Sequence, residues 1–529
     1  MGMDGDSGGG LVNGILLDAS LLFASDHNNQ NLSSASASAS ASLLPAADSL
    51  LRKLRYSKIR TGIFYEPELS AIKVCLLEEM TRLKLFDSLI AVASSIENVV
   101  SEVALTWGEN IASHTLVVSG QEELCLKLRN SGWMTAILRS PGHGPANDIE
   151  FPTGSETSSS ILINKLEELP LTVCHLNKKA ESKENILVVG YIMKPSREED
   201  FAKRGAFPLY PTQDGLIFLP LNYELPIPAQ LQQVDILLHK ATDEIVDVEM
   251  STASEFVNTI EYTKGMQELQ RYIEHHLDCC VIDPFPNICP VLDRLKIQQI
   301  LFGLENLCLK SCYKIRGPRF LKVESFKEPN LQDRLFEAKL SLPNIVKPQV
   351  ACGVAVAHSM AIVFKMEDYK DLNVPLPAVV QEYVDHSSCL FKFYVLGEKV
   401  YYAIKKSTPN AATLMSLSEE GDLKPILFDS LKSLPIDKKN QQLEDGVNNA
   451  GNHQIDLELV TDAANWLRNV LNLTIFGFDV VIQEATGDHV VVDLNYLPSF
   501  KEVPDDVAVP AFWEAIKWRF RLWKGVEKA

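Results

Sequence analysis

Two apolar segments near the C-terminal end of the chain carry acidic residues where a buried strand usually carries none. The first spans 476–482 and contains Asp479, and the second spans 490–495 after a polar turn. Because side chains alternate along a strand, Asp493 and Asn495 share one face, and an antiparallel hairpin brings Asp479 beside them. A solvated hairpin with its acids in water would contain the same residues, but the Val-Val-Val run before Asp493 favours burial.

These three polar side chains have the chemistry of a magnesium site. Unpaired carboxylates inside an apolar sheet cost several kcal/mol each, so a positive charge is expected beside them. Asp carboxylates and an Asn carbonyl are hard oxygen ligands, which Mg²⁺ accepts while keeping positions for water and phosphate. The sequence therefore predicts that Asp479, Asp493 and Asn495 bind Mg²⁺.

The N-terminal part of the chain has the alternating pattern of a parallel α/β domain. The expected elements are a buried strand at 14–18, helices at 48–56 and 67–85, a strand at 115–119, a helix at 121–130 and a strand at 134–138. The last three form one βαβ unit, whose helix ends at Ser131-Gly132. We therefore expect a Rossmann-like domain over residues 1–180.

Polar and low-complexity segments divide the chain. A Ser/Ala tract near 32–46 is too poor in large apolar groups to order itself, and we expect it to be disordered. A Pro-, Gly- and Ser-rich stretch at 141–160 is typical of a linker, and a new strand-rich unit begins at 185–191. The polar stretch 438–453 is expected to form a mobile loop within the last domain.

A lysine and a histidine flank a loop of small residues in the C-terminal half. Lys347 is expected at the end of a short apolar strand, since Pro348 cannot continue a central ladder. The loop 351–358 contains Gly353, ends at His358 and precedes another apolar strand. Such a loop could fold over phosphates, although an ordinary hairpin with a surface lysine and histidine fits the spacing equally well.

Later strands carry regularly spaced cations. Segment 377–384 is expected to be a strand whose backbone could pair with an adenine edge. Lys392 and Lys405 alternate with apolar residues, so they face one side of a sheet, as they would on a solvated face. Lys240 ends an earlier apolar run, and Arg294 opens a helix.

Composition narrows the class of function. The chain has 529 residues, 46% of them hydrophobic, which suffices for two or three packed domains. Its formal charge of -19 disfavours binding to nucleic acids or anionic membranes, so an anionic substrate needs a local cluster of Lys and Arg. Ten cysteines without a CxxC pair are typical of a reduced compartment. Neither a secretory signal nor a membrane-spanning run is evident, and we expect a cytoplasmic monomer.

Seven short motifs occur in a characteristic order between Val189 and about Phe500. They are Val189-Gly190-Tyr191, the run 235–243 around Lys240, Leu292-Asp293-Arg294, Val346-Lys347-Pro348, Gly353 with His358 and Met360-Ala361, the run 380–384 with His386, and Phe476-Gly477-Phe478-Asp479 with Asp493-Leu494-Asn495. Each motif is commonplace alone. Together they resemble the inositol-trisphosphate 5/6-kinase and inositol-tetrakisphosphate 1-kinase family, which has the ATP-grasp fold, and they look closest to its plant members.

This resemblance implies an Mg-ATP-dependent kinase of inositol tris- or tetrakisphosphates, with a substrate-side subdomain at 185–295 and ATP-grasp subdomains at 296–529. It implies nucleotide contacts from Arg294, Lys347, Gln381, Glu382, Tyr383, Val384 and Ser407, and Mg²⁺ ligation by Asp479, Asp493 and Asn495. It implies substrate contacts from Arg197, Lys240, Gly353, His358, Lys392, Lys405, Asn495 and Ser499. Catalysis would then depend on Lys347, His358 and Asp493, with His358 as an anchor and charge stabiliser rather than a base.

Three positions depart from the family pattern. Arg197 lies near the usual position of an N-terminal lysine, and Lys405 stands where arginine is common, which replaces a bidentate fork with a point charge. Ser499 follows Pro498 where the family usually has glycine, which puts a close backbone contact with the substrate in doubt. Phosphate selectivity is therefore expected to differ from that of typical members.

Two alternatives to the kinase stay open at this stage. Carboxylate–amine ligases share the ATP-grasp fold, but the resemblance extends to the motif around Lys240, which a ligase would not share. A catalytically weakened inositol phosphate binding or scaffold protein fits the departure at Ser499, although the metal acids are kept.

The N-terminal domain faintly resembles a haloacid-dehalogenase-like core. Asp18 follows a buried strand, and Val118-Ser119-Gly120 ends a later one, but Ser20 stands where such phosphatases have a second acid. We therefore expect a degenerate, non-catalytic domain used for packing or partners rather than an active phosphatase. The expected fold class is α/β, with an ATP-grasp kinase region preceded by this Rossmann-like domain.

Overall fold

The structure is a computed structural model that describes residues 11–24, 42–92, 96–108, 111–139, 161–180, 186–250, 258–276, 278–307, 311–416, 424–432, 434–435 and 455–526. Most of the tract expected near 32–46, the linker at 141–160 and the loop expected at 438–453 lie outside these residues. The chain divides into two compact units, Met1–Leu238 with Arg271–Cys279 and His239–Gln270 with Cys280–Ala529. None of the helices in the described ranges combines the length and the apolarity needed to cross a bilayer.

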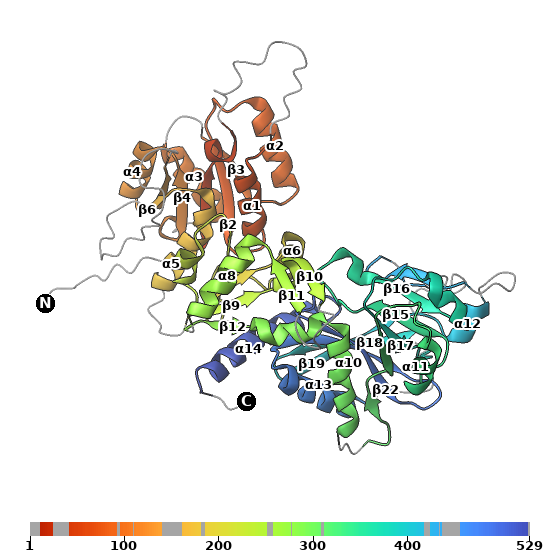
Figure 1. Cartoon of the computed structure of the whole chain (residues 1–529). Coiled ribbons are helices and arrows are strands. Elements are labelled where there is room, and N and C mark those ends of the chain that lie inside the picture. The colour runs from red at the N-terminus through yellow and green to blue at the C-terminus, as the bar shows by residue number, and fades with distance from the viewer. Residues whose placement is uncertain are drawn as a thin grey trace, which may run out of the picture. The chain divides into compact units, whose positions relative to one another are not determined.

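Six parallel strands form the main sheet of the first unit (Figure 1), in the order β3-β2-β1-β4-β5-β6. The strands are β1 (Gly14–Asp18), β2 (Arg60–Tyr65), β3 (Ser88–Ala91), β4 (Thr115–Ser119), β5 (Met134–Leu138) and β6 (Ile161–Ile163). This is the strand order of a doubly wound sheet, in which the carboxyl ends of β1 and β4 meet where the order reverses. The Rossmann-like prediction for this part of the chain is confirmed.

Amphipathic helices cover this sheet because their apolar side chains recur at helical spacing. They are α1 (Pro45–Leu54), α2 (Ala71–Arg82), α3 (Ile96–Trp107), α4 (Glu122–Asn130) and α5 (Leu169–Ala180), with 3-10 turns at Ala19–Leu22, Ala112–His114 and Leu166–Glu168. One face of the sheet packs Leu16, Phe64 and Val117 against Val103 and Trp107 of α3. The helix expected at 48–56 begins earlier, because Pro45 takes the first helical position, where a missing N–H costs nothing.

Residues after α5 continue the first unit. The elements are β7 (Leu187–Ile192), α6 (Pro195–Ala202), β8 (Leu216–Pro220), α7 (Ile227–Leu231) and β9 (Ile236–His239), and β7 pairs in parallel with β8. Asn177 of α5 joins this region to the first sheet. Its Oδ1 accepts from the Val12 N–H at 2.6 Å, and its Nδ2 donates to the carbonyls of Val12 at 3.2 Å and Leu209 at 3.5 Å.

Replacing Asn177 with leucine is expected to lower the free energy of unfolding by about 3 kcal/mol, because buried main-chain groups lose their partners. Asn177 is 0% exposed, so water cannot replace it. Urea denaturation of the full chain measures the change. Asn130→Leu, at the exposed end of α4, is the matched control and should change stability by less than about 0.5 kcal/mol. Equal losses in the two variants would contradict the assignment.

The second unit contains two five-stranded sheets. The first has the order β14-β17-β15-β16-β20, and its neighbouring strands are antiparallel. The strands are β14 (Phe320–Val323), β15 (Asn344–Pro348), β16 (Ser359–Val363), β17 (Ala378–Glu382) and β20 (Ile426–Asp429). Val346 pairs with Ala361 and Val380, and all three pack with Leu331 and Leu335 of α11 (Leu331–Glu337). Since side chains alternate, the neighbouring Lys347 lies on the opposite face of this sheet.

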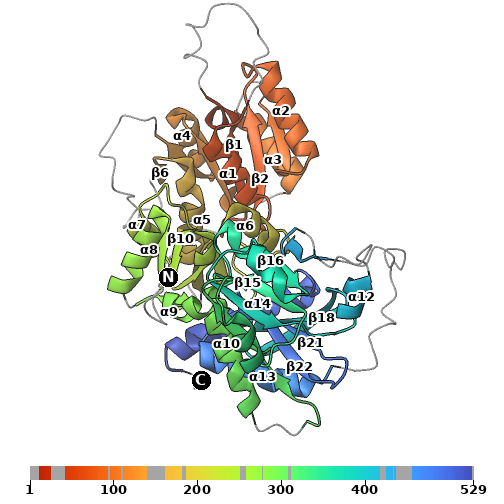
Figure 2. The same cartoon turned by 45° about the vertical axis from the view of Figure 1, so that its right-hand side comes forward.

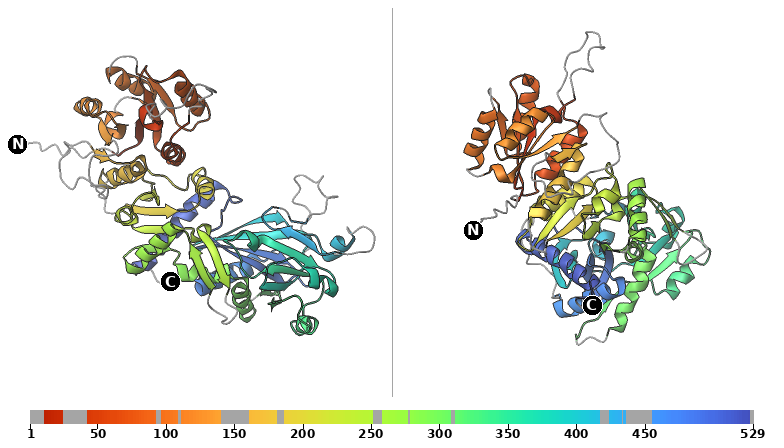
Figure 3. Two further views of the ribbon diagram at one scale, coloured as in Figure 1. Left: turned by 45° about the horizontal axis from the view of Figure 1, so that its top comes forward. Right: turned by 90° about the vertical axis from the view of Figure 1, so that its left-hand side faces the viewer.

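The other sheet has the order β13-β22-β21-β18-β19. It comprises β13 (Ile315–Arg316), β18 (Cys389–Leu396), β19 (Lys399–Lys406), β21 (Ile475–Ile482) and β22 (His489–Tyr496). All pairs are antiparallel except β13 with β22. Within this unit, β15 and β16 lie beside β18, β21 and β22 (Figure 2, Figure 3).

Further elements belong wholly or partly to the second unit; of the helix 264–275, the residues from Arg271 on are part of the first unit. They are β10 (Ile245–Met250), β11 (Asn258–Tyr262), β12 (Cys280–Ile282), α8 (Lys264–His275), α9 (Phe285–Ile288), α10 (Arg294–Phe302), α12 (Ala411–Ser416), α13 (Leu457–Leu471), α14 (Asp505–Trp523), and 3-10 turns at Ala241–Asp243, Cys289–Leu292, Gly303–Asn306, Ala355–His358 and Met366–Asp371. The prediction that a helix opens at Arg294 is confirmed. Asp293 caps that helix by accepting from the Leu295 N–H at 2.8 Å.

Candidate functional site

The predicted hairpin is present, and its acids face each other. Asp479 of β21 pairs directly with Asp493 of β22, and Asn495 pairs with Gly477. Asn495 Nδ2 donates to Asp493 Oδ2 at 3.2 Å. The register shifts between Asp479 and Val480, so β22 accommodates one extra residue beside the acids. The prediction that these three polar side chains come together is confirmed.

Asp479 has the environment of a cation ligand. Its Oδ1 is buried and accepts no hydrogen bond from any part of the chain that the structure describes. Burial raises the pKa of Asp479 well above its ordinary value, and Asp493 raises it further, while nearby lysines partly oppose both effects. Within the described ranges, no group of three or more His, Cys, Asp or Glu side chains could hold a metal ion. The site here has two carboxylates, and its third oxygen donor is the amide of Asn495. A buried carboxylate oxygen without a donor fits a bound divalent ion.

Lys347 reaches these acids from the other sheet. Its Nζ donates to the Val492 carbonyl at 3.4 Å, and the residue is only 8% exposed. Burial lowers the pKa of Lys347 to about 8; Asp493 opposes this shift, Arg294 adds to it, and Asp479 opposes it. At neutral pH the ammonium is therefore mostly charged. The ammonium therefore lies where it could contact an anion, such as a phosphate, that binds a metal held by these acids.

The guanidinium of Arg294 is bound to the loop that was predicted to fold over phosphates. Its Nη1 donates to the carbonyls of Pro348 at 2.6 Å, Val350 at 2.7 Å and Ala357 at 3.0 Å, and its Nη2 donates to Ala351 at 3.3 Å. Arg294 is 5% exposed. It therefore shapes this loop, and its contact with nucleotide phosphates stays a prediction.

Gly353 and His358 lie in the same loop. Gly353 has φ +90°, and a Cβ there would lie 2.6 Å from Ile245 Cδ1, so only glycine lets the loop approach β10. His358 Nδ1 lies 3.2 Å from Ser430 Oγ. Burial lowers the pKa of His358, and Arg294 lowers it further. A neutral imidazole would hold a phosphate by hydrogen bonding rather than by charge.

Lys392 and Lys405 lie on the same face of the sheet as the acids. Lys392 of β18 pairs with Asp479 of β21 on one side and with Ala403 of β19 on the other. Lys405 lies two positions after Ala403, so its side chain has the same orientation as that of Lys392. The predicted one-sided placement is confirmed. Lys405 forms an ion pair with Glu502, whose second oxygen accepts from the Tyr394 hydroxyl. Sequence reasoning missed Glu502, since an acid in a loop gives no signal of its partner.

The other predicted substrate residues are placed as follows. Lys240 is 7% exposed, donates to the carbonyl of Tyr496, and lies 4.9 Å from the centre of that ring. The ammonium of Lys240 is thus held against the main chain of β22 at the residue that follows Asn495. Ser499 lies in the segment that follows β22, and Arg197 is half-buried in α6 of the first unit. The substrate roles of these residues stay predictions.

The strand expected at 377–384 is shorter, because β17 ends at Glu382. Glu382 pairs with Asn344, the first residue of β15, so β15 has no residue left to pair with Tyr383 and Val384. Tyr383 and Val384 therefore lie in the following turn, whose irregular backbone has main-chain groups outside the ladder. Ser407 lies just past β19, and its N–H donates to a carbonyl of the same turn at 2.8 Å.

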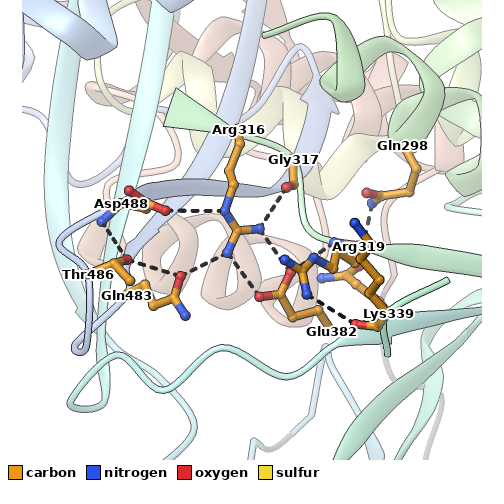
Figure 4. A network of polar contacts seen from close by, with 10 residues as sticks. Gln298, Arg316, Gly317, Arg319, Lys339, Glu382, Gln483, Thr486 and Asp488 are labelled. Carbon is orange, nitrogen blue, oxygen red and sulfur yellow. Dashed lines mark hydrogen bonds and ion pairs between the residues drawn. The ribbon is translucent and has the colours of Figure 1, made fainter. Parts of the chain in front are cut away.

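Glu382 is held by an arginine that sequence reasoning also missed (Figure 4). Arg316 of β13 donates from Nη1 and Nη2 to the two oxygens of Glu382, both at 2.9 Å. Its Nη2 also donates to Gln483 Oε1 at 2.9 Å, and its Nε lies 3.7 Å from Asp488 Oδ2. Arg316 therefore links the segment predicted to hold adenine to the turn of the hairpin that carries the acids. Gln298 Nε2 also donates to Gln381 Oε1, in the strand that ends at Glu382, at 3.4 Å.

Replacing Arg316 with methionine is expected to raise KM for ATP at least tenfold, because the adenine segment loses its connection to the hairpin. The change leaves Glu382 and Asp488 without their cation, and the free energy of unfolding should fall by about 2 kcal/mol, below the full cost of breaking a buried pair because the side chains are partly exposed. Steady-state kinetics and urea denaturation measure the two effects. Arg82→Met, at an exposed position of α2, is the control. An unchanged KM for ATP in Arg316→Met would refute the link.

Asp18 ends β1 in the first unit, and its carboxylate accepts hydrogen bonds from β4 and from the turn that follows β1. Asp18 Oδ2 accepts from Ser119 Oγ at 2.6 Å, and Oδ1 accepts from the Ser20 N–H at 2.9 Å. We expect wild type and Asp18→Asn to release phosphate from p-nitrophenyl phosphate at the same background rate. A wild-type rate above background that disappears in Asp18→Asn would show an active phosphatase instead.

Two family models match different parts of the chain. The model of the ITPK4 N-terminal HAD-like domain matches residues 3–179, and that of the inositol 1,3,4-trisphosphate 5/6-kinase ATP-grasp domain matches residues 310–512. Inositol-tetrakisphosphate 1-kinase 6 of Oryza sativa subsp. indica is 46% identical over 503 residues, which cover 95% of this chain and 88% of that protein. Inositol-tetrakisphosphate 1-kinase of Danio rerio is 30% identical over 295 residues, which cover 55% of this chain and 69% of that protein.

Among solved structures, VanG D-Ala:D-Ser ligase from Enterococcus faecalis is 12% identical and matches with a TM-score of 0.37 over 64% of this chain and 100% of that chain. The family models confirm the expected fold class, an ATP-grasp region after a HAD-like domain. They also decide against the ligase alternative. The chain belongs to the inositol-tetrakisphosphate 1-kinase family of ATP-grasp inositol polyphosphate kinases.

Proposed function

We propose that the chain transfers the γ-phosphoryl group of Mg-ATP to a ring hydroxyl of inositol tris- or tetrakisphosphates. The observation that supports this most is the pair Asp479 and Asp493 with Lys347 beside them from the other sheet. Phosphoryl transfer needs alignment and charge neutralisation more than covalent chemistry from the protein. Acids for a metal and a buried cation for phosphates supply both.

The residues present fit Mg²⁺. Asp479, Asp493 and Asn495 would hold it, since Asp479 Oδ1 accepts no hydrogen bond within the described residues. Asn495 donates from its amide nitrogen to Asp493, which leaves its carbonyl oxygen for a cation. When bound, Mg²⁺ would neutralise charge on the ATP phosphates.

The protein side chains divide the remaining work. Lys347 comes from the other sheet toward the acids, and its ammonium offsets negative charge on the nucleotide phosphates. Lys392, directly across from Asp479, anchors a substrate phosphate close to the reacting group. His358 adds a hydrogen bond to the substrate, and the backbone of 381–384 receives the adenine. Arg294 acts indirectly, because it fixes the carbonyls of Ala351 and Ala357 in the loop that would cover the phosphates.

One set of contacts favours a second candidate function, inositol phosphate binding with little or no turnover. Three cations expected to meet phosphates are engaged by the protein itself. Arg294 donates to main-chain carbonyls, Lys405 pairs with Glu502, and Lys240 donates to the Tyr496 carbonyl. The retained acids still favour the kinase, since a binding protein has no use for a pair of facing buried carboxylates.

Measuring ADP formation with a panel of inositol tris- and tetrakisphosphates separates the two candidates. A kinase should form ADP and a more highly phosphorylated inositol in equal amounts, and EDTA should stop both. Chromatography of the products from defined isomers identifies the hydroxyl that is modified. Calorimetric binding of the same compounds without any ADP formation would overturn the kinase proposal and support the binding protein.

A further inference from the structure

An acidic residue, Glu502, lies beside the lysines that the proposed function assigns to inositol phosphate binding. Glu502 lies between β22 and α14, and its side chain is 18% exposed. Lys405 pairs with one of its oxygens, and the Tyr394 hydroxyl donates to the other. Burial would raise the pKa of Glu502, but the bonds from Lys405 and Tyr394 and the charge of Lys392 outweigh it, so the pKa is lowered and the carboxylate is charged.

The backbone holds Glu502 in place over this sheet. A Cβ at Gly477 would lie 3.0 Å from Pro498 Cγ, so the segment after β22 crosses close to the strands that carry the acids. Leu497 and Phe500 of that segment are 0% and 1% exposed, which anchors it in the core. Glu502 is therefore a fixed charge rather than a mobile surface acid.

The charges on this part of the face decide which ligand it accepts. Lys392 and Lys405 carry two positive charges, and Glu502 cancels one of them. A carboxylate accepts a hydrogen bond from a ring hydroxyl, but it repels a phosphate dianion. Specificity arises in this way from a repulsive group as well as from attractive ones.

We propose that Glu502 is a specificity-determining residue that excludes a phosphate from the ring position facing the Lys405–Glu502 pair. This inference rests on the proposed function, because it takes the inositol phosphate to lie over Lys392 and Lys405. The substrate class it selects is an inositol phosphate with a free hydroxyl at that position. Inositol phosphates that carry a phosphate at that position, a larger share of the isomers as the number of phosphates rises, are disfavoured.

Glu502→Gln tests the proposal because it removes the charge and keeps the shape. The ratio of kcat/KM for inositol tetrakis- and pentakisphosphates to that for trisphosphates should rise at least tenfold, and KM for ATP should not change. The increase should shrink at high ionic strength, as expected for a charge effect. Tyr394→Phe removes a bond to the same carboxylate without changing its charge, and it should leave the ratio within about twofold of wild type.

Lys405→Met supplies a variant with the opposite expectation. It leaves Glu502 without its cation, so the ratio should fall below wild type. If Glu502 only anchors its segment, Glu502→Gln and Lys405→Met should move the ratio in the same direction and lower thermal stability alike, which would overturn the proposal. An unchanged ratio in folded Glu502→Gln would also overturn it.

Calorimetric titration with the same inositol phosphates keeps the test independent of turnover. If wild type forms no ADP, the proposed kinase activity fails. The ratio of dissociation constants still reports on Glu502, and it should shift at least tenfold toward the more phosphorylated ligands in Glu502→Gln. Binding that is equally tight in both proteins would refute the role of Glu502 alone.

Discussion

Replacing Asp493 with asparagine is expected to lower kcat for ADP formation by about 10³-fold or more, as expected when electrostatic stabilisation of the transferring phosphoryl group is lost. Asp493 faces Asp479 across the hairpin and accepts from Asn495, so the variant keeps the shape and the amide contact of the site. Only the charge and the affinity for a hard cation are removed. KM for ATP should rise as well, since the nucleotide would enter with its metal.

The same substitution is expected to stabilise the protein when no metal is present. Asp493 raises the pKa of the buried Asp479, which shows that the two carboxylates repel each other. Removing one charge relieves this repulsion and gives up the attraction to Lys347, so the free energy of unfolding should rise by only about 1 kcal/mol at pH 8. A site that lowers stability for the sake of function behaves in this way, whereas a structural acid would not.

Thermal unfolding with and without Mg-ATP measures this second effect. Mg-ATP should raise the midpoint of wild type through linkage, and the increase should be much smaller in Asp493→Asn. Asp506→Asn, which removes the same charge at an exposed position of α14, is the matched control. Near-normal turnover in Asp493→Asn, or equal stabilisation of both proteins by Mg-ATP, would contradict the metal assignment.

The hairpin could be predicted because its chemistry is local. Alternation places Asp493 and Asn495 on one face, and a short turn leaves little choice of partner strand for Asp479. Three strands of the first sheet, β1, β4 and β5, and the helix at Arg294 were predicted for a similar reason, because apolar runs and caps depend on neighbours along the chain, whereas β2, β3 and β6 were not predicted. The family motifs added the order of these pieces, which local patterns do not contain.

The contacts that tune the site could not be predicted, because each joins distant segments. Arg294 binds carbonyls more than 50 positions away, and Arg316 binds Glu382 66 positions away. Glu502 reaches Tyr394 across 108 positions. A single charged residue has no periodicity, so its partner is set only once the fold brings the segments together. The sequence therefore predicted which cations are present, but not which of them the protein already neutralises.

Replacing Lys347 with methionine is expected to lower kcat by about 10² to 10³-fold, comparable to removing one preorganised group that stabilises developing charge. Lys347 is a buried cation that acts on both facing acids, and Asp493 is the strongest of the charges that favour its ionised form. Methionine keeps the length of the side chain and loses the ammonium. Lys347→Arg keeps the charge and should retain more of the activity, although its planar fork cannot copy a point charge.

The effect of this variant on stability has the opposite sign to that of Asp493→Asn. Without Lys347 the two carboxylates lose a buried cation, and the free energy of unfolding should fall by about 2 kcal/mol at pH 8. The double variant Lys347→Met with Asp493→Asn should be more stable than the sum of the two single effects, because the attraction between Lys347 and Asp493, which each single variant loses, is then lost only once. A double-mutant cycle from urea denaturation measures this coupling, which should exceed about 1 kcal/mol for buried charges that act on each other. Additive effects would mean that Lys347 does not act on these acids, and its role at the nucleotide phosphates would then lose its structural support.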